Sequence, residues 1–293
     1  MMIPASELIL RPDGSIYHLH LLPGQVADTI ITVGDPERVG EVSRRFDRIE
    51  LRVEAREFVT HTGELNGQRL SVISTGIGTD NVDIVLNELD ALFNIDLKRR
   101  EIAAKPTSLT FLRLGTSGAF QSDIPLDSVV LSTASLSLDG LLPFYPTTAV
   151  DSGLSAALSR HLEEAGTPLP TPPTVVRPLL PDFLVNPDPD RIATGITMTA
   201  SGFYASQGRV LRLPTALNGS VLEALRSFRS DSLRITNIEM ETAGIYALAT
   251  ALGHRSASLS ALLANRAQGT FSRQPARTVD QLIDYGLSLL TGK

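Results

Sequence analysis

The sequence predicts a single α/β domain in which a central β-sheet is flanked by helices, and three observations support this fold class. Short apolar runs rich in β-branched residues alternate with amphipathic helical patterns along the chain. With 293 residues, the chain is long enough to bury a substantial core. Neither repeats nor low-complexity segments interrupt the alternation. We therefore expect one domain over residues 1–293.

The expected strands are short and apolar, whereas the expected helices are longer and carry apolar residues on one face. Strands are predicted at Thr29–Val33, Leu70–Ser74, Leu109–Leu114, Ser128–Thr133, Ile192–Ala200, Arg234–Ile238 and Ser256–Ala264. Helices are predicted at Pro36–Phe46, Asn81–Phe93, Ser152–Ala165, Ser220–Arg229, Glu239–Leu252 and Thr278–Leu290. Such alternation favours a largely parallel sheet, because crossover helices join consecutive parallel strands.

One proline-rich segment, Gly166–Pro189, stands apart from this alternation. A strand pattern follows it directly, so we interpret it as a long surface connection and not as a linker between domains.

Composition excludes several classes of function. Lys and Arg total 26 against 32 Asp and Glu, and this net charge of −6 argues against a protein that binds nucleic acid through bulk charge. The absence of cysteine removes disulfides, thiolate metal sites and cysteine nucleophiles. No apolar run approaches the roughly 18 to 20 residues that span a bilayer, and the first ten residues lack a signal-peptide pattern. We expect a protein of the cytoplasm with no membrane partner.

Three glycine-rich turns follow predicted strands and could hold an anion. They are Gly34-Asp35-Pro36, Thr75-Gly76-Ile77-Gly78 and Gly115-Thr116-Ser117-Gly118. Backbone N–H groups in such turns face an anion, although strand-to-helix turns also use glycine for geometry alone. The second turn lacks the third glycine of a dinucleotide fingerprint, and no P-loop or GxSxG motif occurs.

Arg38, Arg56 and Arg113 are candidates to bind a phosphate dianion, because guanidinium groups match its oxygens bidentately. Surface ion pairs are the alternative for Arg38 and Arg56. Arg113 differs because it lies within the apolar run Leu109–Leu114, where an unpaired charge is costly. It must therefore meet an anion or a carboxylate.

Two further segments supply groups that suit sugar hydroxyls and a planar ring. The carboxylates of Glu239-Met240-Glu241 follow a predicted strand and could accept the hydrogen bonds of vicinal sugar hydroxyls, or could simply complement a helix dipole. In the second segment, Phe203 offers a stacking surface, and Gln207 and Arg209 offer edge recognition of a planar heterocycle. A plain loop is the alternative for this second segment.

His18 and His20 alternate along an extended segment and could face the same side. A zinc pair is disfavoured because no third ligand has an evident spacing, and we expect no metal site.

Taken in order, these segments resemble the nucleoside phosphorylase-I family, its uridine-cleaving bacterial members most closely. The similar stretches run from Tyr17 to Arg266: Tyr17-His18-Leu19, Gly34–Arg38, Arg56-Glu57-Phe58, Ser74–Gly78, Phe111–Gly118, Phe203-Tyr204 with Gln207 and Arg209, Glu239–Glu241, and Asn265-Arg266.

The resemblance implies a mixed sheet flanked by helices, a dimer-based homo-oligomer, usually a hexamer, and active sites shared between subunits. Phosphate would bind to Gly34, Arg38, Arg113 and Thr116, with Arg56 supplied by the partner subunit. Met240 and Glu241 would hold the ribose hydroxyls, beside Glu239, and the partner's His18 would hold the 5′ end. Phe203, Gln207 and Arg209 would hold uracil, with Arg113, Glu241 and Arg209 as the catalytic groups.

The reaction implied by the resemblance is the reversible phosphorolysis of uridine to uracil and ribose 1-phosphate, a step of nucleoside salvage. Inorganic phosphate is the co-substrate and no other cofactor is expected, although some relatives bind a monovalent cation near the position of Glu57. Purine-cleaving relatives carry an acidic residue where this chain has Asn265, and an amide cannot act as a general acid. A purine or methylthioadenosine phosphorylase and a catalytically silent nucleoside-binding protein remain the alternatives.

Overall fold

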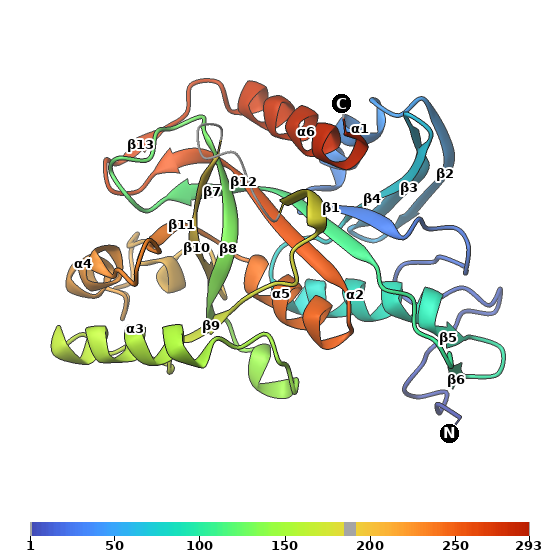
Figure 1. Cartoon of the computed structure of the whole chain (residues 1–293), viewed down its shortest axis with the longest axis horizontal. Coiled ribbons are helices and arrows are strands. Elements are labelled where there is room, and N and C mark those ends of the chain that lie inside the picture. Colours follow the sequence, from blue (N-terminus) through green and yellow to red (C-terminus); the bar gives the residue numbers. More distant parts are fainter. Residues whose placement is uncertain (1, 185–191, 293) are drawn as a thin grey trace.

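The computed structural model describes residues 2–184 and 192–292 (Figure 1). Its strands are β1 (Thr29–Val33), β2 (Arg48–Ala55), β3 (Phe58–Leu65), β4 (Gln68–Ser74), β5 (Ile95–Asp96), β6 (Glu101–Ile102), β7 (Thr110–Ala119), β8 (Val129–Leu138), β9 (Thr174–Val176), β10 (Ala193–Ala200), β11 (Ile235–Glu239), β12 (Arg255–Asn265) and β13 (Thr270–Phe271). The α-helices are α1 (Pro36–Ser43), α2 (Thr79–Asn94), α3 (Ser152–Glu164), α4 (Gly219–Ser227), α5 (Thr242–Ala251) and α6 (Pro275–Thr291).

The central sheet is mixed, and part of it closes on itself. Neighbouring strands follow the order β13-β12-β8-β10-β11-β7-β1-β4-β3-β2, and β12 also pairs with β7. Because of this extra pairing, β7, β12, β8, β10 and β11 form a closed ring, and β1 to β4 extend from it as an open wing. The expected α/β class and central mixed sheet are confirmed, whereas the expectation of a largely parallel sheet is wrong. Both pairings of the β2–β3–β4 wing are antiparallel, and so are the β7–β11 and β8–β12 pairings of the ring.

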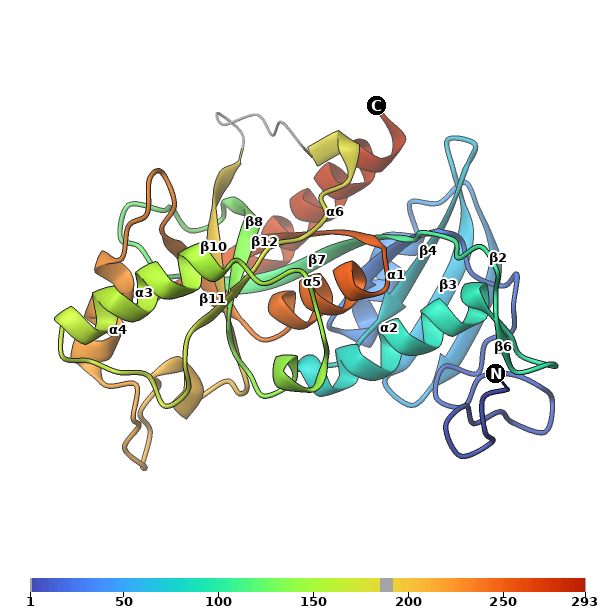
Figure 2. The same ribbon diagram turned by 60° about the horizontal axis from the view of Figure 1, so that its bottom comes forward.

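Helices cover both faces of the sheet, as expected (Figure 2). Ile30 and Ile31, adjacent in β1, are fully buried in opposite core layers because strand side chains alternate between faces. The layer around Ile30 packs against α2 and α5, and the layer around Ile31 packs against α1 and α6. A third cluster joins α3 and α4 to β8, β10 and β11. Within the described ranges, no helix is both long and apolar enough to cross a bilayer.

The edge strand β2 and its neighbour β3 are the largest elements that the sequence pattern did not predict. In β2, charged residues alternate with partly buried apolar ones, and the strand lies at the edge of the sheet. Its neighbour β3 buries polar residues, namely Thr60, His61 and Thr62. Neither therefore forms the apolar run expected of a buried strand. The Gly166–Pro189 connection also contains β9, although its residues 185–189 lie outside the described ranges.

Two predicted boundaries at chemically important residues are wrong. Gly115–Gly118 is not a turn, because β7 continues to Ala119 with β12 paired alongside over its whole length. Glu239 does not open a helix but ends β11, and α5 begins at Thr242. Local composition favoured a turn and a helix, and pairing with distant strands overrode both preferences.

These two corrections locate an opening in the sheet. On one side of β7, β1 pairs as far as Arg113 and β11 pairs from Gly118, whereas β12 covers the other side throughout. Residues 114–117 of β7 therefore have no strand neighbour on the first side in the part of the chain that the structure describes. Their backbone borders a gap where β1 and β11 separate, and such points are where α/β sheets hold ligands.

Candidate active site

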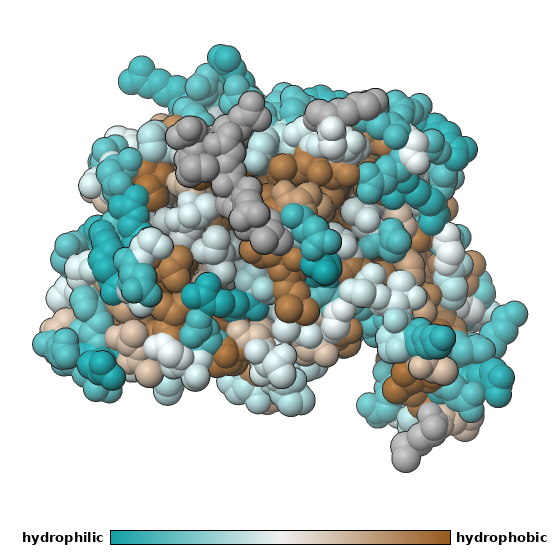
Figure 3. All heavy atoms as spheres, viewed as in Figure 1, coloured by the Kyte–Doolittle hydropathy of each residue, from teal (hydrophilic) through white to brown (hydrophobic). Residues whose placement is uncertain are grey.

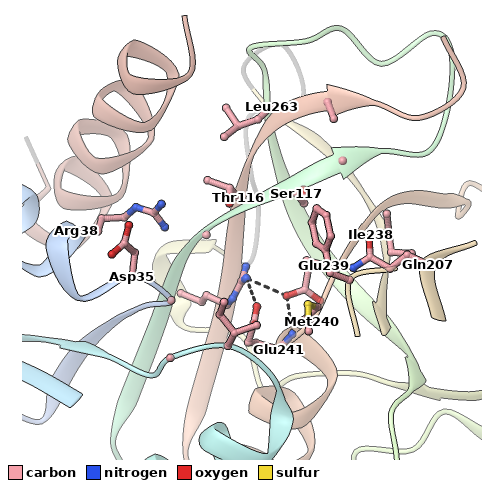
Figure 4. Close-up of a pocket in the computed structure, with 18 of the residues that line it drawn as sticks. Asp35, Arg38, Thr116, Ser117, Gln207, Ile238, Glu239, Met240, Glu241 and Leu263 are labelled. Carbon is pink, nitrogen blue, oxygen red and sulfur yellow. Dashed lines mark hydrogen bonds and ion pairs between the residues drawn. The ribbon is translucent and has the colours of Figure 1, made fainter. Parts of the chain in front are cut away.

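A cavity of about 680 Å³ lies over this gap. It is lined by residues from the ends of β1, β4 and β11, the middle of β7 and the segment after β10 (Figure 4). Ten of the twelve predicted site residues line it: Gly34, Arg38, Arg113, Thr116, Phe203, Gln207, Arg209, Glu239, Met240 and Glu241. The other two, His18 and Arg56, do not. In Figure 4, Asp35 and Arg38 lie at one end, Gln207 at the other, and Glu239, Met240 and Glu241 between them.

The end that contains Arg38 is suited to an anion. Asp35 caps α1 by accepting a hydrogen bond from the Glu37 N–H, and the helix begins at the cavity wall. Burial lowers the pKa of Arg38, with an opposing contribution from Asp35, and its buried Nε has no hydrogen-bond partner in the described part of the chain. An anion here would meet both a helix N-terminus and an incompletely paired guanidinium.

Arg113 is buried, as predicted for a charge within an apolar strand, and it meets carboxylates. Its Nη2 lies 2.6 Å from Glu241 Oε2 and 3.1 Å from Glu239 Oε2. Its Nη1 makes longer hydrogen bonds of 3.4 and 3.3 Å to the hydroxyls of Ser258 and Ser260. Burial alone would lower the pKa of Arg113, but Glu239 and Glu241 outweigh it and raise that pKa.

Gly115 leaves the space that the Arg113 guanidinium occupies. The two residues lie on one face of β7, and a Cβ at position 115 would be 2.0 Å from Arg113 Nη1. The guanidinium is held by four side chains and cannot move aside freely. The glycine that resembled a turn residue is therefore required by a close side-chain approach.

Glu239 is saturated by protein contacts. Its carboxylate accepts hydrogen bonds from the Thr199 hydroxyl and from the backbone N–H groups of Glu241 and Thr242, in addition to its ion pair with Arg113. Burial raises the pKa of Glu239 despite the opposing effect of Arg113. These contacts join β10, β11 and α5, so Glu239 holds the site together. These contacts also leave fewer lone pairs of the Glu239 carboxylate available to a sugar than we expected from the sequence.

Glu241 is the better placed of the two carboxylates for a ligand. Its Oε1 accepts a hydrogen bond of 2.9 Å from the N–H of Gly78, and its Oε2 pairs with Arg113. Each oxygen thus has one protein donor and keeps a lone pair. Met240 lies beside it in the cavity wall.

The opposite end of the cavity presents hydrogen-bond donors beside an aromatic ring. The Arg209 guanidinium lies 3.8 Å from the centre of the Phe203 ring and donates to the Phe203 carbonyl and to Gln207 Oε1. Because Arg209 occupies Oε1, the Gln207 amide N–H groups remain available. This end is therefore suited to a flat ligand with carbonyl oxygens on its edge.

Arg266 does not line the cavity, but its charge lies near Arg209 at this end, and we predicted no role for it from the sequence. Burial together with Arg209 and Arg226 lowers the pKa of Arg266 to about 10, so it stays charged at neutral pH. Its Nη1 is buried and has no hydrogen-bond partner in the described part of the chain. A Cβ on Gly118 would lie 3.1 Å from Arg266 Cγ, which places its stem against the cavity-lining strand β7. The signal for its role was its position just after the predicted strand Ser256–Ala264.

His18 and Arg56 lie outside the cavity but close to each other. Arg56 is in the turn between β2 and β3, and its guanidinium lies 5.8 Å from the centre of the Tyr17 ring. The His18 ring lies 4.8 Å from the same Tyr17 ring. The next residue, Glu57, lines the cavity. Of the two residues in this turn, Glu57 therefore borders the cavity and Arg56 lies outside it. His20 pairs with Arg11, and no group that could bind a metal is found in residues 2–184 and 192–292.

The two cavity arginines should differ in their effect on stability. Arg113→Ala leaves two buried carboxylates without their cation and is expected to lower the free energy of unfolding by about 3–5 kcal/mol. Arg38→Ala removes a guanidinium whose Nε has no partner among the described residues, and it should lower the free energy of unfolding by about 1 kcal/mol or less. Urea unfolding followed by circular dichroism compares the two variants in phosphate-free buffer.

The deficit of Arg113→Ala should also depend on pH. Without the cation, the pKa of Glu239 in the folded protein rises further above its value in the unfolded chain. The carboxyl group is then more readily protonated at about pH 5, where it no longer carries a buried charge, whereas its ionisation at about pH 8 destabilises the folded state. The deficit should therefore grow as the pH rises. Equal losses of unfolding free energy in the Arg113 and Arg38 variants would contradict the pairing of Arg113 with the two carboxylates. A deficit that shrinks with rising pH would contradict it as well.

Comparisons with known proteins agree with this fold and cavity. The sequence profile of the Phosphorylase superfamily matches residues 28–282. Uridine phosphorylase of Thermococcus kodakarensis is 31% identical over 268 residues, which cover 89% of this chain and 81% of that protein. Uridine phosphorylase of Haemophilus influenzae is 27% identical over 94% of this chain and 99% of its own length.

A solved structure of a nucleoside phosphorylase has the same fold as this chain. The crystal structure of a Trypanosoma brucei nucleoside phosphorylase, described as showing uridine phosphorylase activity, superposes with a TM-score of 0.85 at 26% identity. The match covers 98% of this chain and all of that one. The resemblance that the ordered segments indicated is confirmed: the chain belongs to the phosphorylase superfamily.

Proposed function

We propose that this protein is a uridine phosphorylase, which transfers ribose from uridine to phosphate and so serves nucleoside salvage. The observation that carries the proposal is the order of groups along the cavity. Arg38, whose Nε has no partner among the described residues, and a helix N-terminus come first, then carboxylates, then an aromatic ring with donors. Phosphate, ribose and uracil require these groups in this order. The named relatives support the same activity.

Phosphate would bind at the Arg38 end, against Gly34, Thr116 and the start of α1. Arg38 supplies a charge, and Nη1 of Arg113, held only by two long bonds to serine hydroxyls, supplies a second. These groups would hold the phosphate dianion against the anomeric carbon of the ribose. Such positioning of the two reactants would contribute to the rate acceleration.

Glu241 would accept hydrogen bonds from the ribose hydroxyls and favour the positive charge that develops on the sugar as the glycosidic bond loosens. Negative charge develops at the same time on the uracil. Gln207, Arg209 and Arg266 would stabilise it with N–H donors and positive charge. No covalent intermediate and no cofactor besides phosphate enter this scheme.

The donor-rich end favours uracil over cytosine. Uracil presents carbonyl oxygens to Gln207 and Arg209, whereas the amino group of cytosine would bring a donor against their N–H groups. Asn265 opposes the purine alternative. Its amide donates to the carbonyls of Gln121 and Ile124 and accepts from the N–H groups of Ala267 and Gln268, so it neither faces a base freely nor supplies an acid.

The active form would be a dimer-based oligomer in which His18 and Arg56 complete the partner's cavity. Their absence from their own cavity and their common position beside Tyr17 support this arrangement. Apolar side chains are also exposed near the N-terminus and on β6, including Met2, Ile9 and Ile102. Figure 3 shows an apolar patch on the projection that carries β5, β6 and the N-terminus.

The direct test is a phosphate-dependent assay that follows loss of nucleoside absorbance with uridine, 2′-deoxyuridine, thymidine, cytidine and inosine. We expect phosphate-dependent cleavage of uridine and little cleavage of cytidine or inosine. Preferred cleavage of inosine would favour the purine alternative. Nucleoside binding without turnover would favour the silent binding protein.

Base recognition can be separated from phosphate binding. Gln207→Ala and Arg209→Ala should each lower kcat/KM for uridine by about 10- to 100-fold, because charge-assisted hydrogen bonds of about 1.5–3 kcal/mol are lost. The KM for phosphate should change little, because that site lies at the other end of the cavity. Steady-state kinetics with each substrate varied in turn measures both constants. Unaltered uridine kinetics in both variants would place the base elsewhere.

Shared sites predict complementation between inactive variants. Arg56→Ala and Glu241→Ala should each be inactive, yet a mixed dimer contains one complete site. Refolding equal amounts together makes about half the dimers mixed, so roughly a quarter of wild-type activity should return. Refolded wild type is the control for yield. If nothing returns while the wild type recovers, Arg56 acts in its own subunit or takes no part.

A further inference from the structure

Glu88 of α2 holds the segment that carries His18. Its carboxylate accepts hydrogen bonds from the backbone N–H of His18 at 3.1 Å and of Leu19 at 3.0 Å. It also lies 2.6 Å from His18 Nδ1. The two backbone contacts fix the carboxylate against the chain, so its third contact sets the direction of the imidazole ring.

This contact determines which nitrogen of His18 is free. An ionised carboxylate only accepts hydrogen bonds, so Nδ1 must carry the proton. In the neutral imidazole, Nε2 then holds a lone pair, and no hydrogen bond to Nε2 is found within the described part of the chain. The His18 side chain keeps 27% of its surface exposed, whereas that of Glu88 keeps 13%. The free nitrogen is thus on the more accessible of the two groups.

We propose that Glu88 is a positioning residue that makes His18 a hydrogen-bond acceptor for the 5′-hydroxyl of the nucleoside in the partner's cavity. This inference rests on the proposed function, because it needs a nucleoside substrate and a shared site. A hydroxyl can donate to a neutral Nε2 that is held in place, whereas the other tautomer would present a donor. Glu88 would therefore contribute to the recognition of nucleosides that carry a free 5′-hydroxyl.

The test is the ratio of kcat/KM for uridine to kcat/KM for 5′-deoxyuridine. We expect the wild type to favour uridine by about 3- to 10-fold, the effect of one neutral hydrogen bond. In His18→Ala and in Glu88→Gln the ratio should fall toward one, and the double variant should match His18→Ala. Glu163→Gln, the same change at an exposed residue of α3, is the matched control and should keep the wild-type ratio.

A structural role alone would lower kcat/KM for both substrates equally and leave the ratio unchanged, and this result would overturn the proposal. Because Glu88→Gln could fail to fold, a second measurement uses the wild-type protein. Nitrogen NMR of isotope-labelled histidine, with His18 assigned from His18→Ala, should show Nδ1 protonated and Nε2 unprotonated near pH 8. The opposite tautomer would also overturn it. Absence of uridine cleavage by the wild type would reject the proposed function instead, and the NMR measurement would still decide the tautomer.

Discussion

The burial of one guanidinium between two carboxylates constrains the rest of the site. Arg113 comes from β7, Glu239 from the end of β11, and Glu241 from the start of α5. Separating these charges in a buried environment costs several kcal/mol, so the three elements must meet in one geometry. Gly115 must lack a side chain for the same reason, since a Cβ would occupy the place of the guanidinium. The Gly78 turn is fixed by its bond to Glu241.

Sheet topology explains why this arrangement leaves room for a ligand. β7 is paired with β12 over its whole length, but on its other side β1 and β11 separate between Arg113 and Gly118. A continuous sheet would fill this space with a strand. The separation instead exposes the backbone around Thr116, while the ion cluster joins β7 to the end of β11 and the start of α5. The cavity therefore has a rigid floor, which a preorganised site requires.

Single residues could be predicted from the sequence where their environment was local. Arg113 within an apolar run had to be buried and paired, and it is. Its partners could not be identified, because Glu239 and Glu241 lie more than a hundred residues away and local composition placed Glu239 in a helix. Gly115 resembled a turn residue because the guanidinium beside it is visible only once the strand is formed. Arg266 acquires its charge environment from Arg209 and Arg226, which only the fold brings near.

The two cavity arginines differ in how their charge is balanced, and this difference bears on how the proposed reaction is arranged. Arg113 is compensated by Glu239 and Glu241, so it can hold these carboxylates in place without any ligand. Asp35, the carboxylate that acts most strongly on Arg38, already caps α1, and the Nε of Arg38 has no hydrogen-bond partner within residues 2–184 and 192–292. A phosphate dianion would thus relieve the electrostatic cost of burying Arg38 without breaking the cluster that orients Glu241. In the proposed reaction, Arg113 would chiefly orient the group that holds the sugar and Arg38 would chiefly capture phosphate, so phosphate would bind without loss of the geometry that the sugar needs.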